Sequence, residues 1–484
     1  MRWGRGLILL VFVVIAAGSG FYFRVYGAEL GEVHAQTYIL IEAESGRVLV
    51  GHDVDARMFP AATTMILTAI LAYEHLDMGA IYIVGNEVTQ IPFGAASNHH
   101  QSGEAILGIN LIRGMIVGAG IDTANVVALH VARAVSEDEN MTFAQAQTFF
   151  TTLMNQRAAE LGAANSRFVN PHGFHHANHT TTAYDLAVIA RHALSIPTLA
   201  QIAALPAWSG PIGGTTNAAE LPEDIRAQNP TLPTRSWRSP NELLQAGENF
   251  FAGASGLRTG FTNFAGETLV ASAARDGITL ISVTMNSPLI DDAPTRWADA
   301  RSLFEYGFEN FAHRTMTAGV SRIYIENPRL GEEVYLEVEL AQPEFTRFLS
   351  QAEAERVVAQ ISWLENATTY FIILDEHGHE EVSQWLVVPP IEEGQILGHV
   401  SFILDDDVLE TTTIHAAREV LPRTTASDID HHRARFIEIF FSRASIPYWI
   451  AAISVGALIT IAGFILRNKV REKKKHQVYK FRKK

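Results

Sequence analysis

Alternating apolar and polar positions predict strands at both ends of one large segment of the chain. The run TYILIEAESGRVLVGHD, residues 37–53, contains two alternating segments joined by a glycine turn. Three strand-like runs separated by turns follow in SGLRTGFTNFAGETLVASAARDGITLISVTM, residues 255–285. Strands that are close in sequence pair most easily as antiparallel hairpins. The pattern therefore favours an antiparallel sheet over a doubly wound one.

Helical periodicity fills the segment between these strands and continues after them. Residues 205–240 are rich in Pro, Gly and Asn and predict a long connection. Helices around an antiparallel sheet make this an α/β protein of the α+β type. The predicted helices run from Ala62 to about Leu76 and over residues 110–135, 142–162, 181–194 (opened by capping threonines) and 294–311.

The pattern changes near residue 313. From about Thr315 to Leu421 the chain has short alternating runs, which predict a small all-β domain over residues 313–425. The following segment, residues 426–445, contains DIDHHRARFIEIFFSRAS and predicts an amphipathic linker helix. No internal repeat is evident in the sequence.

An uncharged apolar segment follows, IPYWIAAISVGALITIAGFIL, residues 446–466. As a helix it is about 31 Å long, which matches a hydrocarbon thickness of roughly 30 Å. Tyr448 and Trp449 lie at one edge, and a tail with ten Lys or Arg, residues 467–484, follows the other. Basic residues favour the cytoplasmic side, so we expect a transmembrane helix with a cytoplasmic tail.

The N-terminal residues 1–35 combine a basic start with an apolar stretch, as signal peptides do. Cleavage after Val33-His34-Ala35 and retention as an uncleaved signal anchor both remain open. Either alternative places residues 36–445 outside the membrane. The expected location is the cell membrane, with an extracellular ectodomain.

Composition narrows the chemistry. The 484-residue chain has no cysteine, which excludes a cysteine nucleophile and cysteine zinc sites. Its net charge is −15 although both termini are basic, so the region between them is strongly acidic and disfavours nucleic acid as a partner. All lysines lie at or after Lys469, and the expected ectodomain therefore has none.

Several blocks resemble the low-molecular-mass penicillin-binding proteins, the serine-type D-alanyl-D-alanine carboxypeptidases (peptidase family S11). PAATTMILTA, residues 60–69, is similar to the family's S-x-x-K helix, and residues 168–194 are similar to its NPHG block. GLRTGFTNFAGETLVASAARDGITLISV resembles the K-T-G strand and the hairpin after it. The resemblance covers about residues 36–421. It implies a β-lactamase/transpeptidase-like domain over residues 36–312, then the small all-β domain.

The positions that carry the family's chemistry hold other residues here. Ala62 stands in place of the serine nucleophile and Met65 in place of the lysine base. Ala119 and Ile121 occupy the Ser and Asn places of the S-x-N element. An alkyl side chain can neither attack a carbonyl group nor transfer a proton. The resemblance therefore predicts a degenerate active site with no intact catalytic residue.

Few neighbouring residues could replace the lost catalytic groups. Thr63 and Thr64 carry hydroxyls next to the lost serine, but on a helix they point away from its direction. The four histidines of NPHGFHHANH have no carboxylate at the spacing of a metal site. His172 and His179 match the family block, and the resemblance implies that they are loop-packing groups. His99 and His100 are interpreted as a solvated loop pair. No metal and no cofactor are expected.

The K-T-G element is Arg258-Thr259-Gly260, followed by Phe261, and these four form the expected substrate-binding set. The resemblance implies that its cation and hydroxyl hold the terminal carboxylate of the substrate. Arginine can do this with a bidentate fork. It also implies that the backbone N–H groups of Ala62 and Phe261 form the oxyanion hole.

The sequence thus predicts a membrane-anchored, catalytically inactive member of the carboxypeptidase family. Its expected partner is a peptidoglycan stem peptide or a cell-wall protein, and its expected role is binding or scaffolding at the cell wall. Two alternatives stay open: an active serine-type carboxypeptidase with a non-standard site, and a structural membrane protein with a vestigial groove.

Overall fold

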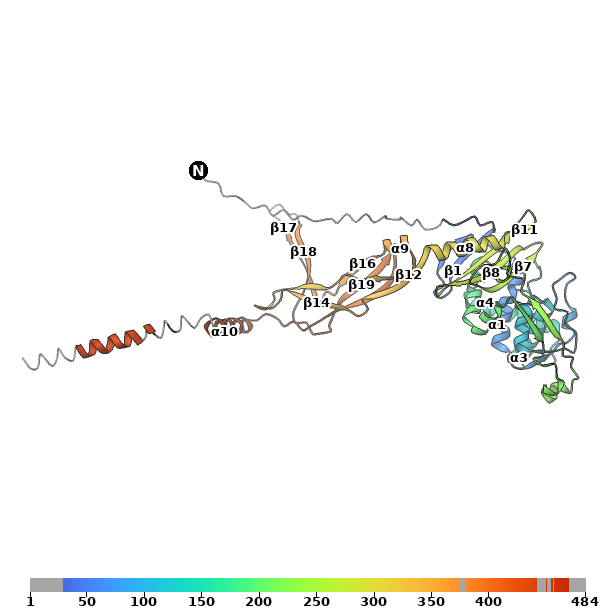
Figure 1. Ribbon diagram of the computed structural model, residues 1–484, viewed down its shortest axis with the longest axis horizontal. Coiled ribbons are helices and arrows are strands. Elements are labelled where there is room, and N and C mark those ends of the chain that lie inside the picture. Colours follow the sequence, from blue (N-terminus) through green and yellow to red (C-terminus); the bar gives the residue numbers. More distant parts are fainter. Residues whose placement is uncertain (1–28, 375–379, 442–449, 451–453, 456, 470–484) are drawn as a thin grey trace, which may run out of the picture. The chain divides into compact units, whose positions relative to one another are not determined.

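The computed structural model describes residues 29–374, 380–441, 450, 454, 455 and 457–469 (Figure 1). The chain divides into two compact units, the first ending at Ala312 and the second beginning at His313. The predicted N-terminal signal segment and basic tail lie almost entirely outside the described residues, and the predicted membrane span lies partly outside them.

The first unit is built on a five-stranded sheet with the strand order β2-β1-β9-β8-β7. Every neighbouring pair in it is antiparallel, as the sequence pattern predicted. Strand β7 is paired on one side only, so it is an edge of the sheet. The strands are β1 (Thr37–Glu42), β2 (Val48–His52), β7 (Ala254–Thr262), β8 (Gly266–Arg275) and β9 (Ile278–Ser287).

Helices cover both faces of this sheet (Figure 1). Helix α8 lies along one face, and α1 and α4 lie on the other side. The α-helices are α1 (Met65–His75), α2 (Gly108–Ile116), α3 (Ile121–Ser136), α4 (Phe143–Glu160), α5 (Ala183–Ser195), α6 (Pro197–Ala203), α7 (Glu223–Arg226) and α8 (Arg296–Asn310). The 3₁₀ turns are η1 (Ala61–Thr64), η2 (Asn86–Thr89), η3 (Ala218–Glu220) and η4 (Glu242–Leu244).

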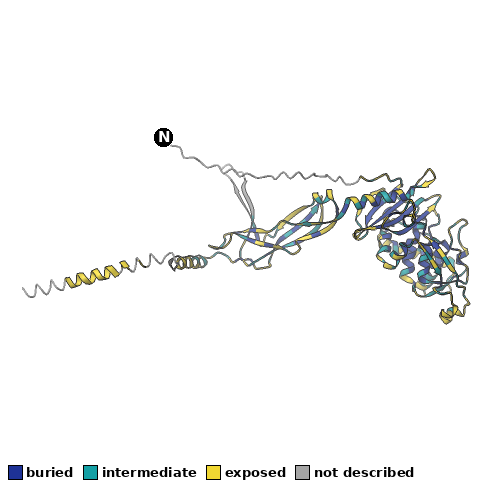
Figure 2. Ribbon diagram, in the orientation of Figure 1, coloured by how far each residue is buried: buried dark blue, intermediate teal, exposed yellow. Residues whose placement is uncertain are grey.

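Helix α1 is the centre of the core. Its first eight residues, Met65 to Ala72, are all buried, so the helix is enclosed on every side. Figure 2 shows buried residues concentrated in the strands and helices of this unit. Helix α5 begins as predicted, because the Thr182 side chain accepts a hydrogen bond from the backbone N–H of Asp185.

The segment predicted as a long connection, residues 205–240, contains regular structure instead. Strands β5 (Ala207–Pro211) and β6 (Thr234–Arg238) pair antiparallel, with Trp208 stacked on Trp237 at 4.8 Å between ring centroids. This cross-strand aromatic pair stabilises the hairpin. The surrounding Pro and Gly residues had led to the prediction of a loop here. The remaining short strands are β3 (Ile81–Ile83), β4 (Ala105–Leu107), β10 (Leu289–Ile290) and β11 (Ala293–Pro294).

The second unit is mainly β. Its seven-stranded sheet has the order β16-β19-β20-β14-β13-β18-β17, and β12 pairs with β15. Leu336, Leu397, Val400 and Ile414 are fully buried in its core. The elements are β12 (Phe311–Thr317), β13 (Arg322–Ile325), β14 (Tyr335–Leu340), β15 (Glu344–Ser350), α9 (Gln351–Arg356), β16 (Val358–Trp363), β17 (Thr368–Leu374), β18 (Glu380–Val387), β19 (Ile396–Leu404), β20 (Asp407–Ala416) and α10 (Thr425–Phe441).

Within the described part of the chain, no single helix has both the length and the apolar character needed to cross a membrane. Only α5 and α6 together meet these requirements, and they are bent by 108° relative to each other.

Candidate functional site

A cavity of about 620 Å³ in the first unit is lined by all eight positions that the sequence singled out. They come from three parts of the chain: the start of α1, the loop before α3, and the edge strand β7. The fold thus brings the three family elements together. The positions are Ala62, Met65, Ala119, Ile121, Arg258, Thr259, Gly260 and Phe261.

The backbone around Ala62 is held by two close glycines. A Cβ atom at Gly173 would lie 1.6 Å from the carbonyl oxygen of Ala61, and one at Gly260 would lie 2.6 Å from the nitrogen of Ala62. Only glycine permits these approaches. Ala61 itself has a left-handed backbone, with φ of 49°. The turn that presents Ala62 to the cavity is therefore tightly fixed, although its side chain is a methyl group.

The two threonines after Ala62 use their hydroxyls within the fold. Thr63 Oγ1 donates to the carbonyl oxygen of Pro60 at 2.7 Å, and Thr64 Oγ1 donates to that of Ala61 at 2.9 Å. Thr64 Oγ1 also lies 2.9 Å from His179 Nε2. Both threonines are buried. These bonds hold the turn in place and leave neither hydroxyl directed at the cavity.

The loop before α3 forms a second wall of the cavity. Ala119, half-buried, has a left-handed φ of 62°, and Ile121 is the buried first residue of α3. The Asp122 carboxylate accepts hydrogen bonds from the backbone N–H groups of Asn98, His100 and Thr123 and from the Ser97 hydroxyl. Asp122 thus supports the local backbone.

The prediction of a solvated histidine pair was wrong for one member. His99 is exposed, but His100 is buried, with Nδ1 2.9 Å from Glu104 Oε2 and Nε2 3.1 Å from Thr123 Oγ1. Glu104 is also paired with Arg235 at 2.6 Å. The loop folds back so that one histidine of the doublet enters a buried polar network.

Arg258 is the most unusual group in the cavity. Its side chain is buried, the residue being 3% exposed, and burial together with the nearby Arg296 lowers its pKa to about 10. Nη2 donates to the sulfur of Met65 at 4.0 Å. Nε and Nη1 have no hydrogen-bond partner among the described residues. At neutral pH this is a buried cation with free donors, an arrangement that is costly without an anion.

Arg296 is a functional candidate that the sequence reasoning missed. It is the first residue of α8, lines the same cavity, and is paired with Glu267. Its guanidinium also lies over the Trp297 ring, 4.4 Å from the centroid. Burial lowers its pKa to about 10, while Glu242 opposes the shift. Two guanidinium groups therefore face one cavity, and within the described part of the chain only that of Arg296 has a carboxylate partner.

The hydroxyl of Thr259, expected to bind the substrate carboxylate, donates its proton within the sheet instead. Its Oγ1 donates to the carbonyl oxygen of Thr268 at 3.0 Å. Thr268 Oγ1 in turn lies 3.2 Å from the carbonyl oxygen of Pro60. These bonds tie β7, β8 and the turn at η1 together. The Thr259 oxygen keeps lone pairs toward a ligand, but its proton is used within the sheet.

The histidine-rich loop packs against the same turn. Burial lowers the pKa of His172 and of His179 to about 3, so both are neutral at pH 7. His172 Nδ1 accepts from the N–H of Phe174, and His179 Nδ1 accepts from that of Val169. Both histidines serve as packing groups, as predicted. Within the described residues, no set of three His, Asp or Glu is placed to hold a metal ion.

Aromatic side chains form part of the cavity lining. Phe264 is 67% exposed and stacks on His175 at 3.9 Å, and His175 meets the edge of Phe59 at 4.8 Å. Phe261, next to the Arg-Thr-Gly element, is 55% exposed. Solvent-exposed rings beside a cavity are available to contact a ligand.

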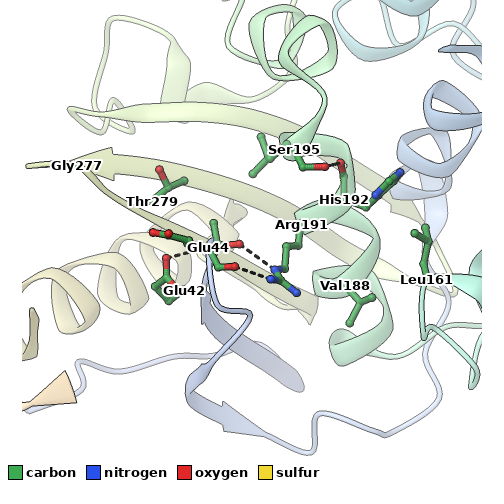
Figure 3. A pocket seen from close by; sticks show the side chains of 11 residues that line it. Glu42, Glu44, Leu161, Val188, Arg191, His192, Ser195, Gly277 and Thr279 are labelled. Atoms are coloured by element: carbon green, nitrogen blue, oxygen red, sulfur yellow. Dashed lines mark hydrogen bonds between the residues drawn. The ribbon is translucent and has the colours of Figure 1, made fainter. Parts of the chain in front are cut away.

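A second cavity, of about 550 Å³, lies away from these residues, near the turn after β1 and the end of α5 (Figure 3). Arg191 donates there to the carbonyl oxygens of Ala43 and Glu44. Ser195 Oγ donates to the carbonyl oxygen of His192. These groups bond to one another, and none of the predicted site residues is among them. The hydrogen bonds of Arg191 and Ser195 in this cavity therefore stabilise the local backbone.

The chain is similar in sequence to known D-alanyl-D-alanine carboxypeptidases. The family model described as D-alanyl-D-alanine carboxypeptidase matches residues 25–288. The D-alanyl-D-alanine carboxypeptidase DacB2 of Mycobacterium tuberculosis is 31% identical, over 57% of this chain and 82% of that protein. DacF of Bacillus subtilis is 23% identical, over 86% of this chain and 92% of that protein.

Solved structures show the same fold. The carboxypeptidase DacD of Francisella tularensis gives a TM-score of 0.56 at 20% identity, covering 81% of this chain and 95% of its own. Penicillin binding protein 5 of Haemophilus influenzae gives 0.53 at 21% identity, covering 82% and 100%. The family match and the 31% identical relative show that the chain belongs to the D-alanyl-D-alanine carboxypeptidase family of cell-wall metabolism.

Proposed function

We propose that this chain is a catalytically inactive, membrane-anchored member of its family that binds peptidoglycan stem peptides through their terminal carboxylate. One observation carries the proposal. The cavity is lined by the buried Arg258, whose guanidinium has no carboxylate partner among the described residues, while Ala62 and Met65 occupy the positions of nucleophile and base.

The argument for inactivity rests on chemistry. The methyl group of Ala62 cannot attack a carbonyl, and the thioether of Met65 cannot take a proton at neutral pH. No lysine precedes Lys469, so none is available as a base in the folded domain. The nearby hydroxyls of Thr63 and Thr64 donate to backbone carbonyls. His172 is neutral, but its Nδ1 already accepts a backbone N–H.

The argument for binding rests on charge and shape. A carboxylate placed in the cavity beside Arg258 would supply the counter-charge that this buried guanidinium lacks among the described residues. Arg296 adds a second guanidinium to the same cavity. The unpaired edge of β7 can accept an extended peptide as an additional strand. A volume of about 620 Å³ is also within the range of ligand pockets.

The cavity argues against a vestigial groove. Filling of the groove by the side chains of Met65 and Ile121 would favour a purely structural role. Both side chains line the cavity, yet it stays open. Membrane anchoring is supported by the uncharged run at residues 446–466 and the basic tail after it. Attachment of this kind would hold the binding domain close to the cell wall.

The test uses the full chain purified in detergent and a tripeptide ending in D-Ala-D-Ala. Calorimetric titration measures binding, and a coupled assay measures released D-alanine. We expect binding without release. Sustained release of D-alanine would establish the active-enzyme alternative, and absence of binding would leave the scaffold alternative.

A further inference from the structure

The walls of the cavity are more apolar than an alanine-ended peptide needs. The four positions where the family has polar groups carry only alkyl or thioether side chains, and aromatic rings extend this surface. The side chains concerned are those of Ala62, Met65, Ala119, Ile121, Phe174 and Phe264. This apolar wall and the two guanidinium groups lie in one cavity, which suits a ligand with a carboxylate next to a bulky apolar group.

The position of Met65 fixes which part of the ligand meets the apolar wall. Its sulfur lies 4.0 Å from Arg258 Nη2, so a carboxylate bound to this guanidinium lies against the Met65 side chain. The substituent on the carbon next to the carboxylate is then within reach of Met65 and its neighbours. In a peptide, that substituent is the side chain of the last residue.

The lost polar groups weaken binding of both kinds of peptide alike, because both have the same backbone amide, so the apolar wall decides between them. Ala119 and Ile121 offer no side-chain partner to a peptide amide, and an unpartnered buried amide is unfavourable. An apolar side chain gains affinity from the same surface, by roughly fourfold for each methylene group that it buries.

We infer that this site selects peptides whose carboxy-terminal residue carries a large apolar side chain, in preference to peptides ending in alanine. The inference rests on the proposed function and names the ligand class of that same site. Met65 and Ile121 are its specificity-determining residues, and Arg258 is its carboxylate anchor.

The experiment compares two tripeptides that differ only in the last residue, D-alanine or D-leucine, each with a free and an amidated terminus. Their affinities for the full chain in detergent are measured by calorimetry. We expect the free D-leucine peptide to bind roughly ten- to fiftyfold tighter than the free D-alanine peptide, given its three additional carbons. Amidation should weaken binding of both.

Variants locate the preference. Ile121→Asn should reduce the preference for D-leucine, whereas Val135→Asn, at an exposed position of the same helix, should leave it unchanged. Ala119→Ser, at a half-buried position, is a milder second variant and should strengthen binding of both peptides alike, leaving the preference unchanged.

Equal affinities for the two free peptides, with the effect of amidation intact, would overturn the inference and leave the proposed function standing. Failure of both peptides to bind would overturn both. A D-leucine preference that is unchanged in Ile121→Asn would show that the cavity wall does not set it, as expected of partition into the detergent, and would also refute the inference.

Discussion

The sulfur of Met65 lies 4.0 Å from Nη2 of Arg258, and both side chains are buried. A thioether is a weak acceptor and carries no charge, so this contact does not neutralise the guanidinium. Met65 stands where the family has a basic residue, and among the described residues the Arg258 guanidinium has no anionic partner. A ligand carboxylate could neutralise it. Replacing Arg258 should therefore stabilise the fold and weaken ligand binding.

Arg258→Met should stabilise the protein. Replacing an unpaired buried charge by an apolar side chain of similar length removes a desolvation penalty, and related replacements have gained about 1–4 kcal/mol. Arg296→Met is the matched control, because it leaves the carboxylate of Glu267 without its partner and should destabilise the fold. Thermal unfolding of both variants measures the contrast. A lower melting temperature for Arg258→Met would mean that Arg258 has a structural partner.

Arg258→Ala should weaken binding of a stem peptide with a free carboxylate by roughly ten- to a hundredfold, because a charge-assisted hydrogen bond contributes about 1.5–3 kcal/mol. Amidating the peptide should weaken binding to the wild type but have little effect on the variant. Calorimetric titration of the wild type and of Arg258→Ala, each with the free and the amidated peptide, measures both effects. Equal affinities in all four would assign Arg258 no part in recognition.

Penicillin should form no covalent adduct with the protein. Acylation needs a nucleophile at position 62 and a base at position 65, and the chain has Ala62 and Met65 there. Intact-mass spectrometry after incubation with a β-lactam measures the outcome, with an active carboxypeptidase of the family as positive control. A stable adduct would contradict the prediction, and its mapped site would identify a substitute nucleophile.

Restoring one group should not restore turnover. Ala62→Ser supplies a hydroxyl without a base, and Met65→Lys supplies a base without a nucleophile, and such groups act as a unit. The double variant should have low activity, since Ala119 and Ile121 still lack polar side chains. Release of D-alanine from a model peptide is the assay. Turnover by Ala62→Ser alone would reveal a base already in place.

Acid should destabilise the domain through its buried histidines. The pKa of His172 is lowered to about 3 by burial, whereas the unfolded chain binds the proton near pH 6.5. Stability is therefore complete above pH 6.5 and falls as the pH decreases from there toward 3. The slope is up to about 1.4 kcal/mol per pH unit for each such histidine.

His172→Asn should flatten this acid dependence by one histidine's share, because Asn can still accept the N–H of Phe174. His176 offers a matched control: it makes the same kind of bond, to the N–H of Asn178, but is exposed. Urea unfolding between pH 7.5 and 5 measures both. An unchanged slope in His172→Asn would show that His172 does not titrate as described.

The sequence predicted the sheet and most of the helices because their signals are local. The alternation in residues 37–53 and 255–285 needs no distant partner to be recognised, and both runs form strands as expected. The hairpin of β5 and β6 was missed because each strand is short and lies among Pro and Gly. What stabilises it is the stack of Trp208 on Trp237, a contact between residues far apart in sequence.

The site was predicted where family blocks mark it and missed where only folding brings residues together. Arg258 stands in a recognisable element, but Arg296 is one arginine among many until α8 carries it to the same cavity. His100 looked solvated beside His99, because a polar doublet does not reveal which member turns inward. Burial of Arg258 was likewise invisible, since it depends on packing between β7 and α1.

The left-handed backbone at Ala119 has a further consequence, for how the sequence can change. An alanine at φ of 62° costs about 1–2 kcal/mol, and its methyl group forms no hydrogen bond in return. Glycine relieves this cost, and asparagine reduces it through local hydrogen bonds. Under laboratory selection for heat resistance alone, position 119 should therefore drift to these residues. Under selection for ligand capture it should instead keep a side chain that suits the cavity, so the two lineages would diverge at this loop.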